Sequence, residues 1–290
     1  MPPLKIFAKL FSKPKRSGDR ARRQSAILTR RQAANNTIMQ ENLYKNLNKL
    51  RQQKPLVHCI TNQVTMHLVA NSLLALGASP IMSSSVEEVE EVTAKASALY
   101  LNIGTLSQTS VRAMLLAGKV ANRKGIPVVL DPVGAGFTAM RNQTCATLLN
   151  DIKITAIRGN ASEIMALSQA GAVGHGVDSR HLVEEAHTHA EWLAQKYDII
   201  IALTGKSDYV TDGNHNLTIE GGHELMALVS GMGCAVGGML AAWLSVEATY
   251  SSAAATLALV GNCGFEAAGR VNGPGSFVAA WLDEIYTTGR

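Results

Sequence analysis

Residues 230–244 read Ser-Gly-Met-Gly-Cys-Ala-Val-Gly-Gly-Met-Leu-Ala-Ala-Trp-Leu, a glycine-rich turn that runs directly into an apolar helix. Gly231 and Gly233 flank a single residue, so the backbone can bend tightly there and expose its N–H groups. The following helix points the positive end of its dipole at the same place, which is typical of an anion-binding site. Cys234 is expected in the first helical turn, where the pKa of a thiol is usually lowered and its side chain can reach a bound hydroxyl. A buried core cysteine is the competing interpretation.

The composition is that of one sizeable globular domain. The chain has 290 residues, of which 47% are hydrophobic and 17% charged, so it can bury a core without disulfides. The four cysteines lie far apart in the sequence and form no C-x-x-C pair, which fits a reducing cytosol. The sequence shows neither a secretory signal nor a long uninterrupted apolar span, so we expect a cytoplasmic protein with no membrane partner.

The positive charge is concentrated at the amino terminus. Residues 1–38 contain ten Lys and Arg against one acid, which leaves 17 basic and 21 acidic residues in residues 39–290. A nucleic-acid partner is therefore disfavoured for the folded domain at residues 39–290. We expect residues 1–38 to be a disordered basic extension or a consequence of the chosen start codon, so their deletion is expected to leave activity intact. A targeting segment or a membrane-surface helix is the alternative.

The remaining sequence alternates between short apolar runs and helical patterns. The apolar runs lack a period of two, which predicts an α/β fold with a central, mostly parallel sheet flanked by helices on both faces. A hairpin around Asp212-Gly213 is expected to form an edge away from the chemistry. The expected strands are residues 56–60, 78–82, 98–103, 127–130, 153–157 and 198–203, and the last helices are residues 235–247, 249–268 and 275–287.

Polar side chains follow several of these expected strands. Ligands of open α/β sheets bind at the carboxyl ends of the strands, so the polar groups there are candidate site residues. Each has a plain alternative: Asn62 can cap a helix, Asp131 can cap a turn, and the segment from Arg158 to Glu163 can be a capping arrangement. Met82 is either core filler or an adaptable wall against an apolar ligand. The candidates at the strand ends are Asn62, Asp131, Arg158, Glu163 and Thr204.

Together these groups are the parts needed for phosphoryl transfer. Asp131 and Glu163 form a carboxylate pair suited to Mg²⁺, Arg158 can bind a phosphate, and the start of the glycine-rich helix can stabilise negative charge. The chain contains neither the G-x-x-x-x-G-K-[ST] sequence nor the kinase-type G-x-G-x-x-G. It is therefore neither a P-loop enzyme nor a protein kinase.

Six motifs in unbroken order resemble the hydroxyethylthiazole kinase family of the ribokinase-like superfamily. The resemblance runs from about residue 42 to residue 277 and does not include residues 1–38. The motifs are Leu-Val-His-Cys-Ile-Thr-Asn at 56–62, Leu-Ala-Leu-Gly-Ala-Ser-Pro-Ile-Met at 74–82, Leu-Asn-Ile-Gly-Thr-Leu at 101–106, Leu-Asp-Pro-Val-Gly-Ala-Gly at 130–136, Ala-Ile-Arg-Gly-Asn-Ala-Ser-Glu at 156–163 and Gly-Met-Gly-Cys at 231–234.

The resemblance implies ATP-dependent phosphorylation of the hydroxyl of 4-methyl-5-(2-hydroxyethyl)thiazole, a salvage step toward thiamine. By position, Met82 and Gly231 match the residues that contact the thiazole, with Asn62 nearby. It further implies a homotrimer with active sites at the subunit boundaries, in which Asn62 and Met82 serve a neighbour's nucleotide site.

The resemblance also assigns the phosphate and metal side of the site. Arg158 and Thr204 match the residues that contact ATP, and Asp131 and Glu163 match the acids linked to Mg²⁺. Cys234 stands where the wider superfamily has an aspartate base. A thiol is a weaker base, and a loose transition state demands little early deprotonation, so Cys234 is expected to position the alcohol more than to ionise it.

Two departures and two rival functions remain open. Met232 stands where the family has a small residue, and Ser230 stands where threonine is more usual. Met232 can alter the size of the pocket.

One rival function is a related kinase for a pyrimidine or a sugar. Cys234 and the pocket formed by Thr61-Asn62 and Met82 argue against it. The other is a catalytically silent protein that binds a thiamine precursor, against which the intact acids and arginine argue.

Overall fold

The computed structural model describes residues 43–169 and 181–290, and in these ranges it contains one sheet of eight strands. The expected extension at residues 1–38 lies outside the described residues. The strand order is β2-β1-β3-β4-β5-β6-β7-β8, with parallel pairing from β2 to β6 and antiparallel pairing of β7 and β8. The strands are β1 Leu56–Ile60, β2 Ser79–Met82, β3 Ala98–Asn102, β4 Val128–Asp131, β5 Ala156–Asn160, β6 Ile200–Thr204, β7 Ser207–Thr211 and β8 Asn216–Glu220.

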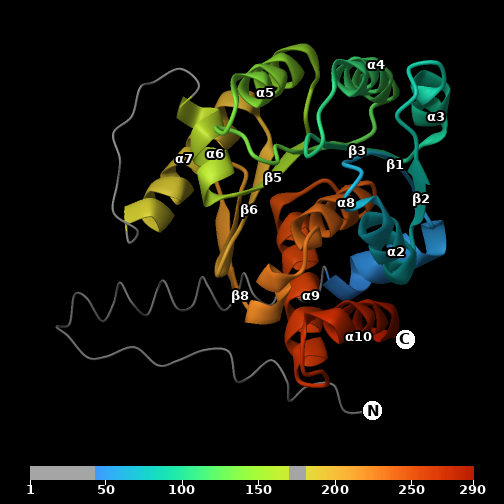
Figure 1. Cartoon of the computed structure of the whole chain (residues 1–290), viewed down its shortest axis with the longest axis vertical. Coiled ribbons are helices and arrows are strands. Elements are labelled where there is room, and N and C mark those ends of the chain that lie inside the picture. Colours follow the sequence, from blue (N-terminus) through green and yellow to red (C-terminus); the bar gives the residue numbers. More distant parts are fainter. Residues whose placement is uncertain (1–42, 170–180) are drawn as a thin grey trace.

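Helices cover both faces of the sheet, which confirms the predicted α/β class. One group packs with a helix at residues 43–53 into one apolar core, and the other group forms a second core on the opposite face. Figure 1 shows the two groups on opposite sides of the sheet. The first group is α2 Met66–Leu76, α8 Met232–Leu244, α9 Tyr250–Ala268 and α10 Pro274–Thr287; the second is α3 Val89–Lys95, α4 Gln108–Lys124, α5 Ala139–Asp151, α6 Ala161–Gln169 and α7 His181–Tyr197.

Strand β3, which lies between β1 and β4, illustrates why the parallel strands of this sheet do not alternate between apolar and polar residues. Every residue of β3 is buried, because helices cover both faces of a parallel sheet. Successive side chains point to opposite faces: Leu99 and Leu101 lie in the core with α4, whereas Ala98 and Tyr100 lie in the core with α8. The next inward position after Tyr100 is Asn102, at the carboxyl end of the strand.

Helix α8 lies close to the sheet because two of its residues have no side chain. A Cβ atom at Gly237 would lie 2.6 Å from Cε2 of Tyr100, and a Cβ atom at Gly238 would lie 2.9 Å from Cγ1 of Val69. The two glycines therefore let the helix contact β3 on one side and α2 on the other. This close approach holds the start of α8 against the carboxyl ends of the central strands.

Several predicted boundaries differ from the structure, and two of the differences concern β5 and α8, the elements that carry Arg158 and Cys234. Strand β5 runs from Ala156 to Asn160 instead of 153–157, because the main chain of Lys153 is held outside the sheet by the side chain of Asn122. The distances are 2.9 Å from Asn122 Nδ2 to the Lys153 carbonyl and 2.7 Å from the Lys153 N–H to Asn122 Oδ1. Helix α8 begins at Met232, three residues before its expected start.

The hairpin was predicted correctly in place. Strands β7 and β8 flank the turn at Asp212-Gly213, and β8 is the outer strand. A 3₁₀ helix, η2 Glu224–Leu228, follows β8 and was not predicted.

In the described part of the chain, none of the helices has the length and apolar character needed to span a bilayer.

Candidate active site

A cavity of about 930 Å³ opens at the carboxyl ends of β5 and β6, beside the start of α8. Its wall includes the glycine-rich turn, the loop after β6, the segment after β8 and part of α9. Most of the predicted site residues border it. These are Arg158, Glu163, Thr204, Gly231, Gly233 and Cys234.

Asp131 lies beneath this cavity at the end of β4 and is fully buried. The Tyr100 hydroxyl donates a hydrogen bond of 2.9 Å to its Oδ2, and Nη1 of Arg158 lies 3.5 Å from the same oxygen. Its other oxygen, Oδ1, is buried without a hydrogen-bond partner. Burial raises the pKa of the Asp131 carboxyl to about 6, with Arg158 opposing the rise and Glu163 adding to it. An unpaired buried carboxylate oxygen is costly unless a ligand or ion satisfies it.

Glu163 forms the capping arrangement that the sequence left open. Its Oε2 accepts a 2.9 Å hydrogen bond from the N–H of Asn160, whose Oδ1 accepts one of 3.0 Å from the N–H of Glu163. Its Oε1 accepts a 3.0 Å hydrogen bond from the N–H of Gly134, in the turn after β4. The carboxylate also borders the cavity, and its charge raises the pKa of Asp131. Glu163 is therefore a cap that also stands in the same compartment as Asp131.

Arg158 connects the end of β5 to the start of α8. Its Nη2 donates a 2.6 Å hydrogen bond to Oγ1 of Thr204, and its Nε is buried without a partner. A Cβ atom at Gly233 would lie 2.3 Å from Nη1 of Arg158, so the guanidinium occupies the space that a side chain would fill. Burial lowers the pKa of Arg158, but Asp131 and Glu163 raise it more, so the group stays charged. A cation and the positive end of a helix meet here, which favours an anionic ligand.

Cys234 lies in the first turn of α8 and is buried. Nδ2 of Asn62 lies 3.3 Å from its Sγ and donates a second hydrogen bond of 2.9 Å to Oδ1 of Asn102. Burial raises the pKa of the Cys234 thiol, and the Asp131 charge raises it further, although hydrogen bonds from neighbouring side chains oppose the rise. This direction is opposite to the predicted lowering, because burial and the nearby Asp131 carboxylate both disfavour the thiolate.

Gly231 is the residue that allows this geometry. It precedes α8 with φ of 89°, a left-handed conformation that favours glycine. A Cβ atom here would also lie 2.4 Å from Cγ2 of Thr65. The turn predicted from the sequence is therefore confirmed, and two independent constraints require glycine at this position.

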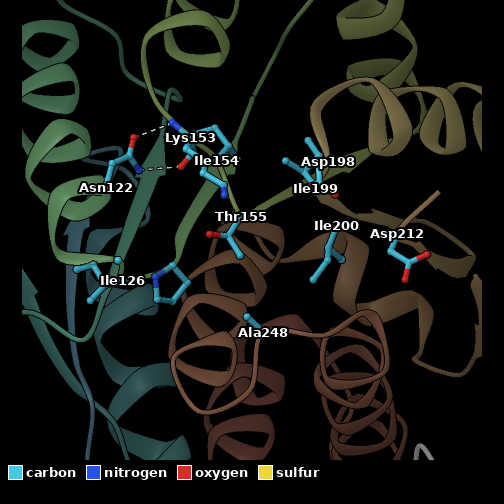
Figure 2. A pocket seen from close by; sticks show the side chains of 12 residues that line it. Asn122, Ile126, Lys153, Ile154, Thr155, Asp198, Ile199, Ile200, Asp212 and Ala248 are labelled. Atoms are coloured by element: carbon cyan, nitrogen blue, oxygen red, sulfur yellow. Dashed lines mark hydrogen bonds between the residues drawn. The ribbon is translucent and has the colours of Figure 1, made fainter. Parts of the chain in front are cut away.

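A second cavity, of about 490 Å³, lies at the opposite edge of the sheet, where β4, β5 and β6 begin (Figure 2). Its labelled side chains include Asn122, Lys153, Asp198 and Asp212. None of the predicted site residues lines it. Asn122 belongs to the last turn of α4, Lys153 and Asp198 each lie between a helix and a strand, and Asp212 lies between β7 and β8.

Comparison with known proteins identifies the family. The model of the hydroxyethylthiazole kinase family matches residues 47–289. A hydroxyethylthiazole kinase of Desulforudis audaxviator is 48% identical over 242 residues, covering 83% of this chain and 89% of the relative. The chain belongs to the hydroxyethylthiazole kinase family. The solved structure of the hydroxyethylthiazole kinase from Pyrococcus horikoshii is 36% identical and superposes with a TM-score of 0.78, covering 84% of this chain and 92% of that one.

The same comparison confirms the predicted fold beyond the hydroxyethylthiazole kinase family. A ribokinase-like superfamily protein from Enterococcus faecalis is 14% identical and has a TM-score of 0.58, covering 79% of this chain and 86% of that one. At this identity the likeness concerns the fold alone. The resemblance seen in the six motifs therefore corresponds to both the family and the ribokinase-like architecture.

Besides Asp131 beneath it, two predicted site residues of this hydroxyethylthiazole kinase family member do not line the large cavity. Met82 lies at the end of β2, half-buried against the core. Asn62 is buried and contacts Cys234 of its own chain at 3.3 Å. This contact places the amide beside the glycine-rich turn of its own subunit. The expectation that Asn62 and Met82 serve a neighbouring subunit stays a prediction.

Three further residues at the site were not identified from the sequence. Tyr100 and Asn102 lie on the same face of β3 and connect Asp131 to Asn62 through hydrogen bonds. Asp208 in β7 borders the large cavity, accepts a 2.9 Å hydrogen bond from the N–H of Gly205, and has a pKa raised to about 6 by burial. The hairpin is therefore not away from the candidate site, contrary to the prediction. The period-two spacing of Tyr100 and Asn102 was the available signal.

Proposed function

We propose that this protein transfers the terminal phosphoryl group of ATP to the hydroxyl of 4-methyl-5-(2-hydroxyethyl)thiazole. Membership of the hydroxyethylthiazole kinase family supports this reaction class. One structural observation carries the proposal: the Arg158 guanidinium and the positive end of α8 meet at the cavity wall, directly above the buried carboxyl of Asp131. Such an arrangement suits an anionic phosphate group that binds together with a metal cation.

The nucleotide phosphates would bind where Arg158 and Thr204 meet the start of α8. Arg158 is charged and has an unpaired Nε, and its Nη2 is held by the Thr204 hydroxyl. The N–H groups of Gly233 and Cys234 lie in the first turn of α8, where an α-helix supplies no acceptor of its own. These N–H groups and the guanidinium can all donate hydrogen bonds to phosphate oxygens. The cavity of about 930 Å³ is large enough for a nucleotide.

Asp131 and Glu163 are the residues that would hold Mg²⁺. The donor set fits this ion, because both groups are carboxylates and Oδ1 of Asp131 is buried without a partner. Among the described residues there is no cluster of three or more His, Cys, Asp or Glu side chains suited to a metal. A two-carboxylate site agrees with the preference of Mg²⁺ for water and phosphate oxygens as its remaining ligands. When bound, the ion would neutralise the negative charge on the transferred group.

The alcohol would lie beside the glycine-rich turn, near Gly231, Asn62 and Cys234. The raised pKa of Cys234 keeps its thiol protonated at neutral pH, so it does not begin as a base. We propose that the thiol and the Asn62 amide orient the hydroxyl, and that Met82 contributes an apolar wall to the thiazole site. In a loose transition state the hydroxyl proton leaves late, so orientation contributes more than deprotonation.

The assembly and location remain proposals. We propose a homotrimer, supported by the position of Met82 on the outer strand β2 and by Val64, which is apolar and 72% exposed in the turn after Asn62. Sedimentation equilibrium is expected to give three times the chain mass, and a monomer would contradict this assembly. A cytoplasmic location is supported by the four cysteines, all of which are unpaired and buried.

A coupled ADP-release assay tests the proposed function. The purified protein is given ATP with the thiazole alcohol, a pyrimidine alcohol or ribose, each with and without Mg²⁺. We expect ADP release to depend on both the thiazole alcohol and Mg²⁺. Release with one of the other alcohols would favour a related kinase, and no release with any of them would favour a binding protein. Arg158→Ala provides the matched control for contaminating kinase activity.

A further inference from the structure

Two buried polar side chains of β3 lie beneath the candidate site and have no role in the function proposed above. Tyr100 and Asn102 are two positions apart, so they share the face that packs against α8. Tyr100 is fully buried and Asn102 nearly so. Polar groups on an inward face are retained when their hydrogen bonds have a structural or functional use.

Tyr100 and Asn102 connect the two ends of the site through side-chain hydrogen bonds. The Tyr100 hydroxyl donates to Oδ2 of Asp131 at 2.9 Å and accepts a bond of 2.8 Å from Nδ2 of Asn102. Oδ1 of Asn102 accepts a bond of 2.9 Å from Nδ2 of Asn62, which also lies 3.3 Å from Sγ of Cys234. A continuous network therefore joins the buried carboxylate to the thiol.

The network depends on space that α8 leaves for the tyrosine ring. A Cβ atom at Gly237 would lie 2.6 Å from Cε2 and 2.8 Å from the hydroxyl oxygen of Tyr100. Any other residue at position 237 would push the hydroxyl away from Asp131. The glycine and the tyrosine therefore form a matched pair across the interface between β3 and α8.

The Tyr100 hydroxyl decides which oxygen of Asp131 is available to a ligand. It holds Oδ2, and Oδ1 is the atom without a partner. Arg158 lies 3.5 Å from Oδ2 and competes for the carboxylate. Without the tyrosine donor, the carboxylate can turn to accept hydrogen bonds from the guanidinium with both oxygens, as arginine and carboxylate pairs commonly do. A cation would then have to break that pair.

We propose that Tyr100 and Asn102 are positioning residues, which fix the Asp131 carboxylate for the cation side of the site and the Asn62 amide for the alcohol side. The inference rests on the proposed function only in assuming that Asp131 faces a complex of nucleotide and Mg²⁺. Hydrogen-bond partners of metal ligands typically contribute 10- to 100-fold to metal affinity or activity.

Tyr100→Phe tests this inference because it removes one oxygen atom and keeps the ring. The measurement is the ADP dissociation constant by calorimetry, with Mg²⁺ and without it, so no turnover is needed. We expect the enhancement of ADP binding by Mg²⁺ to fall about tenfold in Tyr100→Phe, while binding of ADP alone is unchanged. A role in packing alone would alter both dissociation constants by the same factor.

Tyr209→Phe is the matched control. Tyr209 is another buried strand tyrosine whose hydroxyl donates to a carboxylate, Oε1 of Glu191 at 2.5 Å, away from the cavity. We expect its Mg²⁺ enhancement to equal that of the wild type. The inference is overturned if Tyr100→Phe keeps the enhancement within twofold of the wild type, or if Tyr209→Phe lowers it equally.

Asn102→Ala tests the other half of the network and replaces Tyr100→Phe should that variant fail to fold. It removes the donor to Tyr100 and the acceptor for Asn62, so we expect the Mg²⁺ enhancement to fall and the KM for the thiazole alcohol to rise about tenfold. In Tyr100→Phe that KM is expected to stay unchanged. An unchanged enhancement in Asn102→Ala would contradict the inference. Failure of the wild type to bind ADP at all would instead overturn the proposed function, and the inference with it.

Discussion

The two edges of the sheet carry cavities of different character. At the carboxyl edge, Asp131 is buried, has an oxygen without a partner, and has a pKa raised to about 6 by burial. At the amino edge, burial also acts to raise the pKa of Asp212. The N–H groups of His215 and Asn214 donate hydrogen bonds to its carboxylate, which oppose this effect, and the pKa of Asp212 is lowered overall. One oxygen of the Asp131 carboxylate has no hydrogen-bond partner, whereas both oxygens of the Asp212 carboxylate have at least one.

Solvent exposure also distinguishes the candidate site from the cavity at the amino edge. Lys153 and Asp198 at the amino edge are exposed, so solvent screens their charges. At the carboxyl edge, Arg158 is only 13% exposed and is paired with a carboxyl that is itself 0% exposed. Buried ionisable groups with shifted pKa values cluster at functional sites. The volumes of the two cavities alone would not have distinguished the candidate site from the cavity at the amino edge.

The largest expected effect is from Asp131→Asn, which keeps the size of the side chain and removes its charge. We expect kcat/KM to fall by a factor of about 10³ in the ADP-release assay, because removal of a charge-stabilising group typically costs 10² to 10³. Asp198→Asn, at the amino edge, is the control and is expected to stay within twofold of the wild type. Equal losses in both variants would break the contrast between the edges.

The pH dependence of kcat/KM is expected to report the raised pKa of Asp131. The ionised carboxylate is the form that would hold a cation, and burial favours the neutral form, so activity is lost at a higher pH than for an ordinary aspartate. We expect kcat/KM to fall about tenfold per pH unit below about pH 6. A profile that stays flat down to pH 4 would mean that the Asp131 carboxyl has an ordinary pKa.

A smaller effect is expected from Cys234→Ala. The thiol is protonated at neutral pH, so its loss is expected to lower kcat by less than about tenfold, whereas the loss of a general base typically costs 10² to 10⁴. Cys234→Asp is expected to remain active. Complete loss of activity in either variant would assign Cys234 a larger role than orientation.

The smallest effect on catalysis is expected from Asn122→Ala at the amino edge. The change removes two hydrogen bonds to the main chain of Lys153, of 2.9 and 2.7 Å. We expect the free energy of unfolding to fall by about 1 kcal/mol, with kcat and KM unchanged. Urea unfolding and the ADP-release assay measure the two quantities separately. A change in KM without a change in stability would indicate that the amino edge communicates with the site.

Some of this architecture could be predicted because parallel strands bring their carboxyl ends to one edge. Asp131, Arg158 and Thr204 follow apolar runs, so topology alone placed them together, and the glycines before α8 marked the turn. The roles of individual residues in binding remain predictions. The shift in strand β5 could not be predicted, because it depends on a tertiary contact between Asn122 and Lys153.

Other features depended on packing that the sequence does not reveal. Tyr100 lies in a run that was interpreted as uniformly apolar, so its two-residue spacing from Asn102 was not recognised as a signal of the site. The pKa of Cys234 was predicted in the wrong direction, because the helix dipole can be read from the sequence but the burial of the thiol and the nearness of Asp131 cannot. The positions of the candidate side chains were therefore easier to predict than the electrostatic environment that sets their pKa values.

The burial of Cys234 has a consequence for chemical durability. Peroxides and alkylating reagents attack the thiolate, and only where they can reach the sulfur. Cys234 borders the large cavity but is only 8% exposed, and its raised pKa favours the protonated thiol over the reactive thiolate. The sulfur next to the glycine-rich turn is therefore expected to react with oxidants more slowly than an exposed thiol of ordinary pKa.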